Sequence, residues 1–145
     1  MPRSIVRLTA FCTLLAGCAS SGKMLYVSQT SASLNPPDAI FACTRANLDT
    51  LGYRPVSLNL IERRVTGRKV RPDVQPPEPT FYQAYDEIES QVVAGGASGE
   101  TALNLEGHTL YEYRTSAGPW VSERHASDSV QTDLAQLTQK CGGVK

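Results

Sequence analysis

The sequence has few of the residues on which nucleic-acid binding and aromatic-rich binding surfaces usually depend. Aromatic side chains make up only 7% of the 145 residues, with a single tryptophan. The 14 basic side chains are balanced by 14 acidic ones. Nucleic-acid-binding domains carry a strongly basic face, so we expect no nucleic-acid partner.

No motif for metal or nucleophile chemistry is complete. His108 and His125 are the only histidines, whereas a zinc site needs three or four convergent N, S or O ligands. Residues 96–100 approach a G-x-S-x-G nucleophile motif around Ser98, but Glu100 stands where the last glycine belongs. We therefore expect no enzyme activity, no metal and no cofactor. A hydrolase that uses Ser98 or a histidine is the enzymatic alternative.

No apolar run is long enough to cross a bilayer as a helix, which takes about 20 residues. The run from Ile5 to Leu15 comes nearest, and Arg7 interrupts it. Arg3 precedes the run and small residues follow it, an arrangement typical of a cleaved signal peptide.

The run ends in Leu15-Ala16-Gly17-Cys18, which resembles the lipobox of a bacterial lipoprotein signal. The resemblance implies that residues 1–17 are removed and that Cys18 carries the lipid (a diacylglyceryl group, with palmitate or a similar chain on the new amino terminus). Ala19 is not Asp, which implies transfer to the outer membrane of a diderm host, facing the periplasm. A monoderm host would place the protein on the outer leaflet of its plasma membrane. The alternatives are an ordinary secretory signal and a buried amino-terminal helix.

The remainder of the chain is sized for one domain. Removal of residues 1–17 would leave 128 residues. Because Arg3 and Arg7 would be removed with the signal, 12 basic side chains would remain against 14 acidic ones. Residues 18–35 are rich in Ser and Thr and predict a lipidated, flexible tether. Residues 24–27 are more apolar, and are either a short edge strand or loose chain. We expect a single domain over residues 36–145.

Two cysteines belong to this domain. Cys43 and Cys141 form an even pair in an oxidising compartment, which predicts a disulfide. On the chain-entropy model, closing a loop of 98 residues contributes up to about 4.7 kcal/mol. The competing interpretation, a metal or redox site, lacks C-x-x-C spacing.

Periodicity predicts a helix, then strands, then a helix. The first helix begins at Asp38 as its N-cap and ends at Gly52. Alternating Val56, Leu58 and Leu60 predict a strand, and residues 63–71 a second one. Residues 81–93 fit either a helix or a strand, and we favour a strand from about residue 85. Residues 101–113 form the fourth strand, with a bulge at Gly107.

The last helix follows a cap at Ser127 or Asp128. Its stripe of Val130, Leu134 and Leu137 extends to Cys141. The predicted fold is therefore α+β: an N-terminal helix, a four-stranded antiparallel sheet and a C-terminal helix. Both helices pack on one sheet face, and a disulfide bridges them.

This order of elements is similar to that of a broad set of small bacterial envelope lipoproteins without an assigned activity. Gly52-Tyr53 after the first helix and Cys141-Gly142 at the end of the last one carry the resemblance. It implies a fold and a location, and no chemistry.

Two groups of residues are candidates for contact with a partner. The first is a basic strand, which either binds anions through its arginines or is a solvated face paired with Glu87 and Glu89. Its members are Arg63, Arg64, Arg68, Lys69 and Arg71. The second is Trp120, which either lines a groove with Tyr111 and Tyr113 or packs on them across strands.

These features predict a non-enzymatic interaction or structural module held on the membrane through Cys18, with an envelope protein as its partner. The alternative function is a periplasm-facing carrier that binds a lipid or small anionic ligand between helix and sheet. A carrier would need an apolar cavity.

Overall fold

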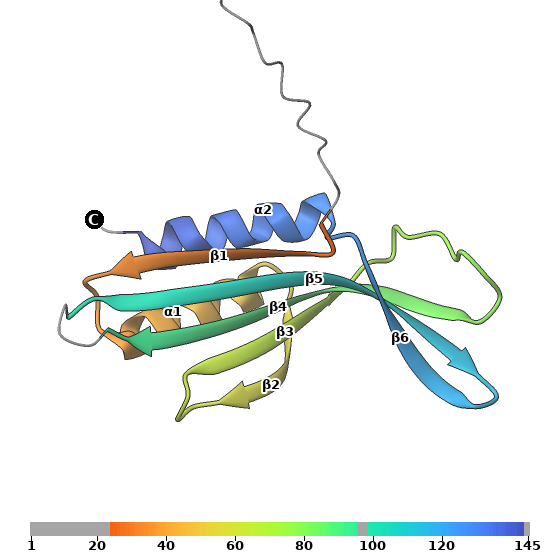
Figure 1. Ribbon diagram of the computed structural model, residues 1–145, viewed down its shortest axis with the longest axis horizontal. Helices are drawn as coiled ribbons and strands as arrows, with labels where there is room; N and C mark the ends of the chain where they lie inside the picture. Colours follow the sequence, from red (N-terminus) through yellow and green to blue (C-terminus); the bar gives the residue numbers. More distant parts are fainter. Residues whose placement is uncertain (1–23, 96–98, 144–145) are drawn as a thin grey trace, which may run out of the picture.

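A computed structural model describes residues 24–95 and 99–143 as one sheet with helices on one face (Figure 1). The predicted signal peptide, the predicted lipidation site Cys18, and Ser98 lie outside the described residues. The strands are β1 (Tyr26–Ser33), β2 (Arg54–Asn59), β3 (Arg64–Val70), β4 (Phe81–Ala94), β5 (Thr101–Thr115) and β6 (Gly118–Arg124). The helices are α1 (Pro37–Thr50), α2 (Asp128–Leu137) and a short π-helical turn, η1 (Thr138–Gly142).

The long strand β5 organises the sheet. It pairs along one side with β4, and on its other side first with β1 and then with β6. The order is β1-β5-β4-β3-β2, and all pairs are antiparallel. The 15 residues of β5 span about 50 Å, which is longer than either helix. As a result, the ends of β4, β5 and β6 extend beyond the helices as an arm (Figure 1).

The core lies between the sheet and the two α-helices. Both α-helices pack on the same sheet face, with α1 over β3 and β4 and α2 over β4 and β5 (Figure 1). Alternate residues of each strand point toward the helices. The buried core comprises Ile40, Phe41, Leu48, Tyr53, Val65, Ile88, Val92, Leu103, Leu105, Val130, Leu134, Leu137 and Cys141.

The predicted four-stranded sheet is wrong: the sheet has six strands, and a strand precedes the first helix. The tether prediction is wrong for Tyr26–Ser33, which is the edge strand β1. Ser31 of β1 packs closely against η1: a Cβ added at Gly142 would lie 1.8 Å from the Oγ of Ser31. The small polar residues that suggested a tether therefore include one that allows this close packing.

The second missed strand is β6, for which the sequence showed only the pair Trp120-Val121. Its seven residues alternate poorly in hydrophobicity, and each of them is either exposed or intermediate in burial. Backbone pairing with β5 and the stacking of Trp120 on Tyr113 hold it in place. Residues 81–94 are a strand, as favoured.

The predicted disulfide is present and joins Cys43 of α1 to Cys141 of η1, with 5.7 Å between their Cα atoms. Ser127 caps α2 by accepting a hydrogen bond from the Val130 amide. Asp38, in contrast, is not a cap, because α1 begins after Pro36 and Asp38 lies in its first turn. None of the helices within the described ranges is both long and apolar enough to span a membrane.

Candidate functional site

The edge strand β2 differs from the strand that its sequence predicts. Alternation of Val56 and Leu58 predicted one buried face, but all six residues of β2 are exposed. A bulge between Pro55 and Ser57 shifts its pairing with β3. Helix α1 lies over β4 and β3 and also contacts β2, but it leaves all six residues of β2 exposed.

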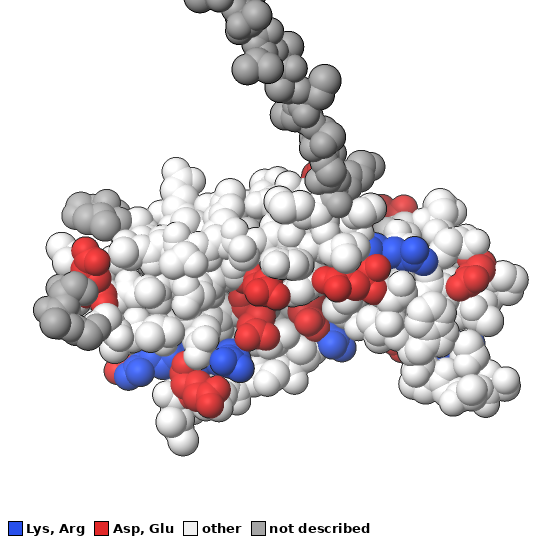
Figure 2. All heavy atoms as spheres, in the orientation of Figure 1, with Lys and Arg blue, Asp and Glu red and all other residues white. Residues whose placement is uncertain are grey.

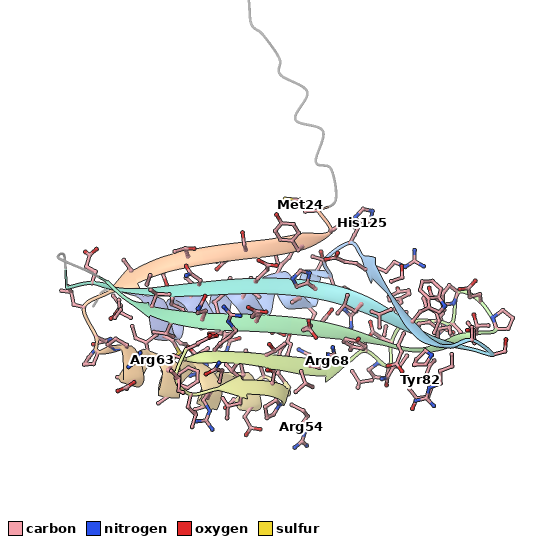
Figure 3. All side chains as sticks on the ribbon, turned by 60° about the horizontal axis from the view of Figure 1, so that its bottom comes forward. Met24, Arg54, Arg63, Arg68, Tyr82 and His125 are labelled. Carbon is pink, nitrogen blue, oxygen red and sulfur yellow. A yellow bond between two sulfur atoms is a disulfide. The ribbon has the colours of Figure 1, made fainter. Side chains whose placement is uncertain are left out.

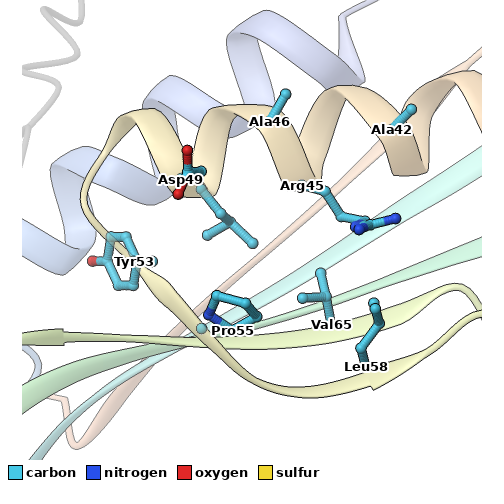
Figure 4. Close-up of a pocket in the computed structure, with 10 residues that line it drawn as sticks. Ala42, Arg45, Ala46, Asp49, Tyr53, Pro55, Leu58 and Val65 are labelled. Carbon is cyan, nitrogen blue, oxygen red and sulfur yellow. The ribbon is translucent and has the colours of Figure 1, made fainter.

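The space between α1 and the β2–β3 hairpin is an apolar cleft of about 440 Å³ (Figure 4). Its floor is formed by the buried side chains of Leu48, Tyr53 and Val65. Pro55 and Leu58 form the wall on the strand side. The volume lies within the range of about 300–1,000 Å³ that small-molecule sites occupy.

Two alanines of α1 border this cleft. Ala42 and Ala46 lie one helical turn apart among its lining residues, and their methyl groups point away from the β2–β3 hairpin (Figure 4). Gly67 lies opposite, on β3. A Cβ there would lie 3.0 Å from Cβ of Tyr53, so Gly67 allows Tyr53 to pack into the floor.

Two charged side chains of α1 line the cleft. The guanidinium of Arg45 extends over Val65 and Leu58 (Figure 4). Asp49 lies one turn further along the helix, toward Tyr53. Arg45 forms no ion pair within the described part of the chain, and its guanidinium carbon lies 5.7 Å from the ring centre of Phe41.

The predicted basic strand does not form one positive surface. On β3, Arg64 and Arg68 point to the outer sheet face, where they pair with Glu89 at 3.6 Å and Glu87 at 2.6 Å. Arg63 precedes β3 and pairs with Asp38 at 2.7 Å. Figure 2 accordingly shows positive and negative groups interleaved on this face. Of the two interpretations of the strand, the structure has the ion-paired one.

Lys69 of β3 points inward to a buried polar pair. Its Nζ lies 2.6 Å from Oδ2 of Asp133, which also accepts a hydrogen bond of 2.9 Å from the Tyr53 hydroxyl. Burial, together with the nearby Asp133 carboxylate, raises the pKa of Tyr53 well above its usual range. The Tyr53 hydroxyl therefore keeps its proton at neutral pH.

Arg71, which follows β3, also turns inward. It pairs with Asp73 at 2.6 Å and with the buried Asp86 at 3.1 Å. Its hydrogen bond lowers the pKa of Asp73 to about 2. Positive charge on this segment is thus used to stabilise carboxylates of the same chain.

Trp120 lies on the arm that extends beyond the helices. Its ring stacks on that of Tyr113 with centres 4.3 Å apart, and 46% of the residue stays exposed. Tyr113 is fully buried, so cross-strand packing rather than a groove explains the pair. Tyr82 and Val121 of the arm are also about half exposed, Val121 on the opposite sheet face from Trp120, and Tyr82 is labelled in Figure 3.

His108 lies where β5 exchanges β1 for β6 as its neighbour. Its ring nitrogens lie 2.5 Å from Glu123 and 2.9 Å from Glu106, and its ring stacks on Tyr26. Burial disfavours the charged ring, but the two carboxylates outweigh it and raise the pKa of His108. Within residues 24–95 and 99–143, His, Cys, Asp and Glu side chains form no group of three that could hold a metal ion.

The sequence led to a cavity between helix and sheet only as the requirement of the alternative carrier function, and to none of the residues that line this cleft as site residues. The signal that was available is the pair of exposed alanines, Ala42 and Ala46, between charged residues of a helix followed by an apolar strand. These residues form a site only because α1 and the β2–β3 hairpin are separated by a gap, which the sequence pattern does not reveal. No family model matches the chain, and no curated protein matches it.

Proposed function

We propose that this protein is a lipoprotein of the bacterial cell envelope, anchored through Cys18 and acting as a non-enzymatic interaction module. The sequence Leu15-Ala16-Gly17-Cys18 supports the anchor. The Cys43–Cys141 disulfide agrees with export, because disulfides persist in oxidising compartments.

The start of β1 limits the distance between the domain and the membrane. Tyr26, the first residue of β1, follows Cys18 by eight residues, which span at most about 28 Å when fully extended. Met24 is held beside the end of β6, since its carbonyl accepts a hydrogen bond of 2.9 Å from the Ala126 amide (Figure 3). An anchor at Cys18 would therefore keep this corner close to the bilayer.

The single observation that carries the interaction function is the exposed aromatic arm. Trp120, Tyr82 and Val121 are half exposed on strands that extend beyond the helices. Arg114 and Arg124 lie over the rings of Tyr82 and Tyr111 at 3.2 and 5.1 Å. Trp, Tyr and Arg are enriched where proteins bind one another. The arm suits an apolar partner surface with carboxylates at its rim.

Labelling tests the anchor. Cells that express the protein would be fed a palmitate analogue suited to chemical tagging, with the Cys18→Ala variant as the control. The proposal expects label on the natural sequence alone, and label on neither protein would contradict it.

Site-specific cross-linking tests the arm. A photoreactive amino acid at position 121 would be compared with one at Val93, which is similarly exposed on β4 outside the arm. The proposal expects one recurring envelope protein cross-linked from 121, and its loss in Trp120→Ala. Equal adducts from 93 and 121, or adducts unaffected by Trp120→Ala, would contradict a role for the arm.

The cleft favours a second candidate function, that of a carrier for a small amphiphilic ligand. A carrier needs an apolar cavity between helix and sheet, and the space between α1 and the β2–β3 hairpin has that position and lining. Binding of a short-chain amphiphile to the purified domain, measured by calorimetry, tests this function.

A further inference from the structure

We propose that the cleft binds a fatty acid, with its carboxylate at Arg45 and its chain lying along the floor toward Tyr53. This inference deepens the carrier function and rests on it. The ligand class that we propose is defined by a single apolar chain that ends in one anionic group.

The lining matches the chain. Ala42, Ala46 and Leu48 on α1, with Pro55, Leu58 and Val65 on the hairpin, offer carbon atoms on both sides of the cleft. The residues named for its floor are buried, while Pro55 and Leu58 on its strand side are exposed. A chain laid between them would remove both its own methylene groups and these walls from water, which is the favourable step in apolar binding.

Arg45 supplies the charge complementarity. Arg63, Arg64 and Arg68 of the β2–β3 hairpin are paired with carboxylates of this chain. Arg45 has no such partner among the described residues, and its guanidinium extends across the cleft (Figure 4). A guanidinium binds a carboxylate through two parallel hydrogen bonds, so an anionic head group gains most at this position.

Asp49 sets the direction of the ligand. It lies four residues beyond Arg45 on α1, toward the Tyr53 end of the cleft. A carboxylate at that end would meet a like charge, whereas one at Arg45 meets an opposite charge. The head group therefore lies at Arg45, and the chain runs past Asp49 toward Tyr53.

The edge of β2 argues against an added peptide strand as the occupant. Pro55 has no amide hydrogen to donate, and the bulge between Pro55 and Ser57 breaks the regular register. Proline and bulges are features that protect sheet edges from pairing with another strand. The proline and the bulge therefore favour a fatty acid over an added peptide strand as the ligand of the cleft.

Calorimetric titration of the purified domain tests this inference, with three probes of equal chain length kept below micelle-forming concentrations. They are dodecanoate, 1-dodecanol and dodecyltrimethylammonium. Arg45→Gln removes the charge, with Arg54→Gln as its control, because Arg54 is an exposed arginine outside the cleft. Leu58→Trp fills the cleft from the strand side, with Val56→Trp as its control, because Val56 is an exposed residue of β2 that does not line the cleft. Circular dichroism would confirm that each variant is folded.

Dodecanoate is expected to bind the natural sequence and both controls, about tenfold more weakly to Arg45→Gln, and not measurably to Leu58→Trp. Equal binding of dodecanol and dodecanoate, with no effect of Arg45→Gln, would overturn the fatty-acid assignment and leave the carrier function standing. Preference for the cationic probe would overturn the assignment as well. Failure of all three probes to bind the natural sequence would overturn both.

Discussion

The hydroxyl of Ser127, the cap of α2, lies 2.9 Å from Oδ2 of Asp86, a carboxylate fully buried in β4. Thr109 of β5 donates a second hydrogen bond to Asp86 at 2.6 Å, and Arg71 pairs with it at 3.1 Å. A buried charge is tolerated only when it is paired and hydrogen-bonded. Asp86 therefore fixes the start of α2 to the middle of the sheet.

Replacement of Ser127 by alanine is expected to lower the free energy of unfolding by about 1–3 kcal/mol. The variant loses the cap of α2, and it also leaves the buried Asp86 with one donor fewer. Urea denaturation followed by circular dichroism measures the change. Thr132→Ala is the control, because its exposed hydroxyl bonds only to the Asp128 carbonyl of the same helix. An equal effect of both substitutions would show that the Ser127–Asp86 contact adds nothing.

Asp86 also shows where prediction from the sequence stops. The alternation of β4 places position 86 on the inward face with Ile88 and Val92, where an aspartate contradicts the pattern. Its partners lie 15, 23 and 41 residues away, so no local pattern reveals them. The Ser127 cap, in contrast, was predictable because it involves only its own helix.

The two missed strands, β1 and β6, lack an apolar stripe for a similar reason. Both pair with the same side of the long β5, and backbone hydrogen bonds to it decide their structure. The disulfide could be predicted from local patterns, because helical periodicity placed Cys43 and Cys141 near the inner faces of their elements.

The cleft could not be predicted in this way. It depends on the distance between α1 and β2, which the periodicity of the sequence does not give.

Loss of the Cys43–Cys141 disulfide is expected to cost about 2–5 kcal/mol of stability. The bond closes a loop of 98 residues, and its removal frees the unfolded chain. Urea titration of Cys43→Ser/Cys141→Ser against the natural sequence measures the loss. Reductant should destabilise the natural sequence and leave the double variant unchanged. Equal midpoints with and without reductant would contradict the prediction.

The environment of His108 predicts a pH dependence of stability. Its pKa is raised in the folded protein because hydrogen bonds to Glu123 and Glu106 outweigh the effect of burial. A raised pKa means that the folded state holds the proton more tightly than the unfolded chain. This contribution is therefore fully present below about pH 6.5, the usual histidine value, and is lost as the pH rises through the raised pKa.

His108→Gln is expected to flatten the fall in melting temperature as the pH rises above about 6.5. Because His108 joins β5 to Glu123 of β6 and stacks on Tyr26 of β1, the amides of these strands should also exchange faster above its pKa. His125→Gln is the matched control, since His125 is exposed. A pH profile that His125→Gln alters as much as His108→Gln would contradict the assignment.

Gly107 is required by close packing of α2 rather than by a bulge. Its pairing with Val27 and Ile88 continues without a break, whereas the bulge of β4 lies between Phe81 and Gln83. A Cβ at Gly107 would lie 2.8 Å from side-chain carbons of both Val130 and Leu134. The prediction of a bulge at this glycine is therefore wrong.

Gly107→Ala is expected to destabilise the protein by about 1–3 kcal/mol, the usual cost of an overpacked core. Leu134 can turn its end away, but the β-branched Val130 is held in one rotamer in a helix. Val130→Ala alone leaves a cavity, and in combination with Gly107→Ala it provides room for the new methyl group. The two substitutions together should cost less than the sum of their separate effects, by urea denaturation of all three variants. Strict additivity would show that Gly107 and Val130 do not compete for the same space.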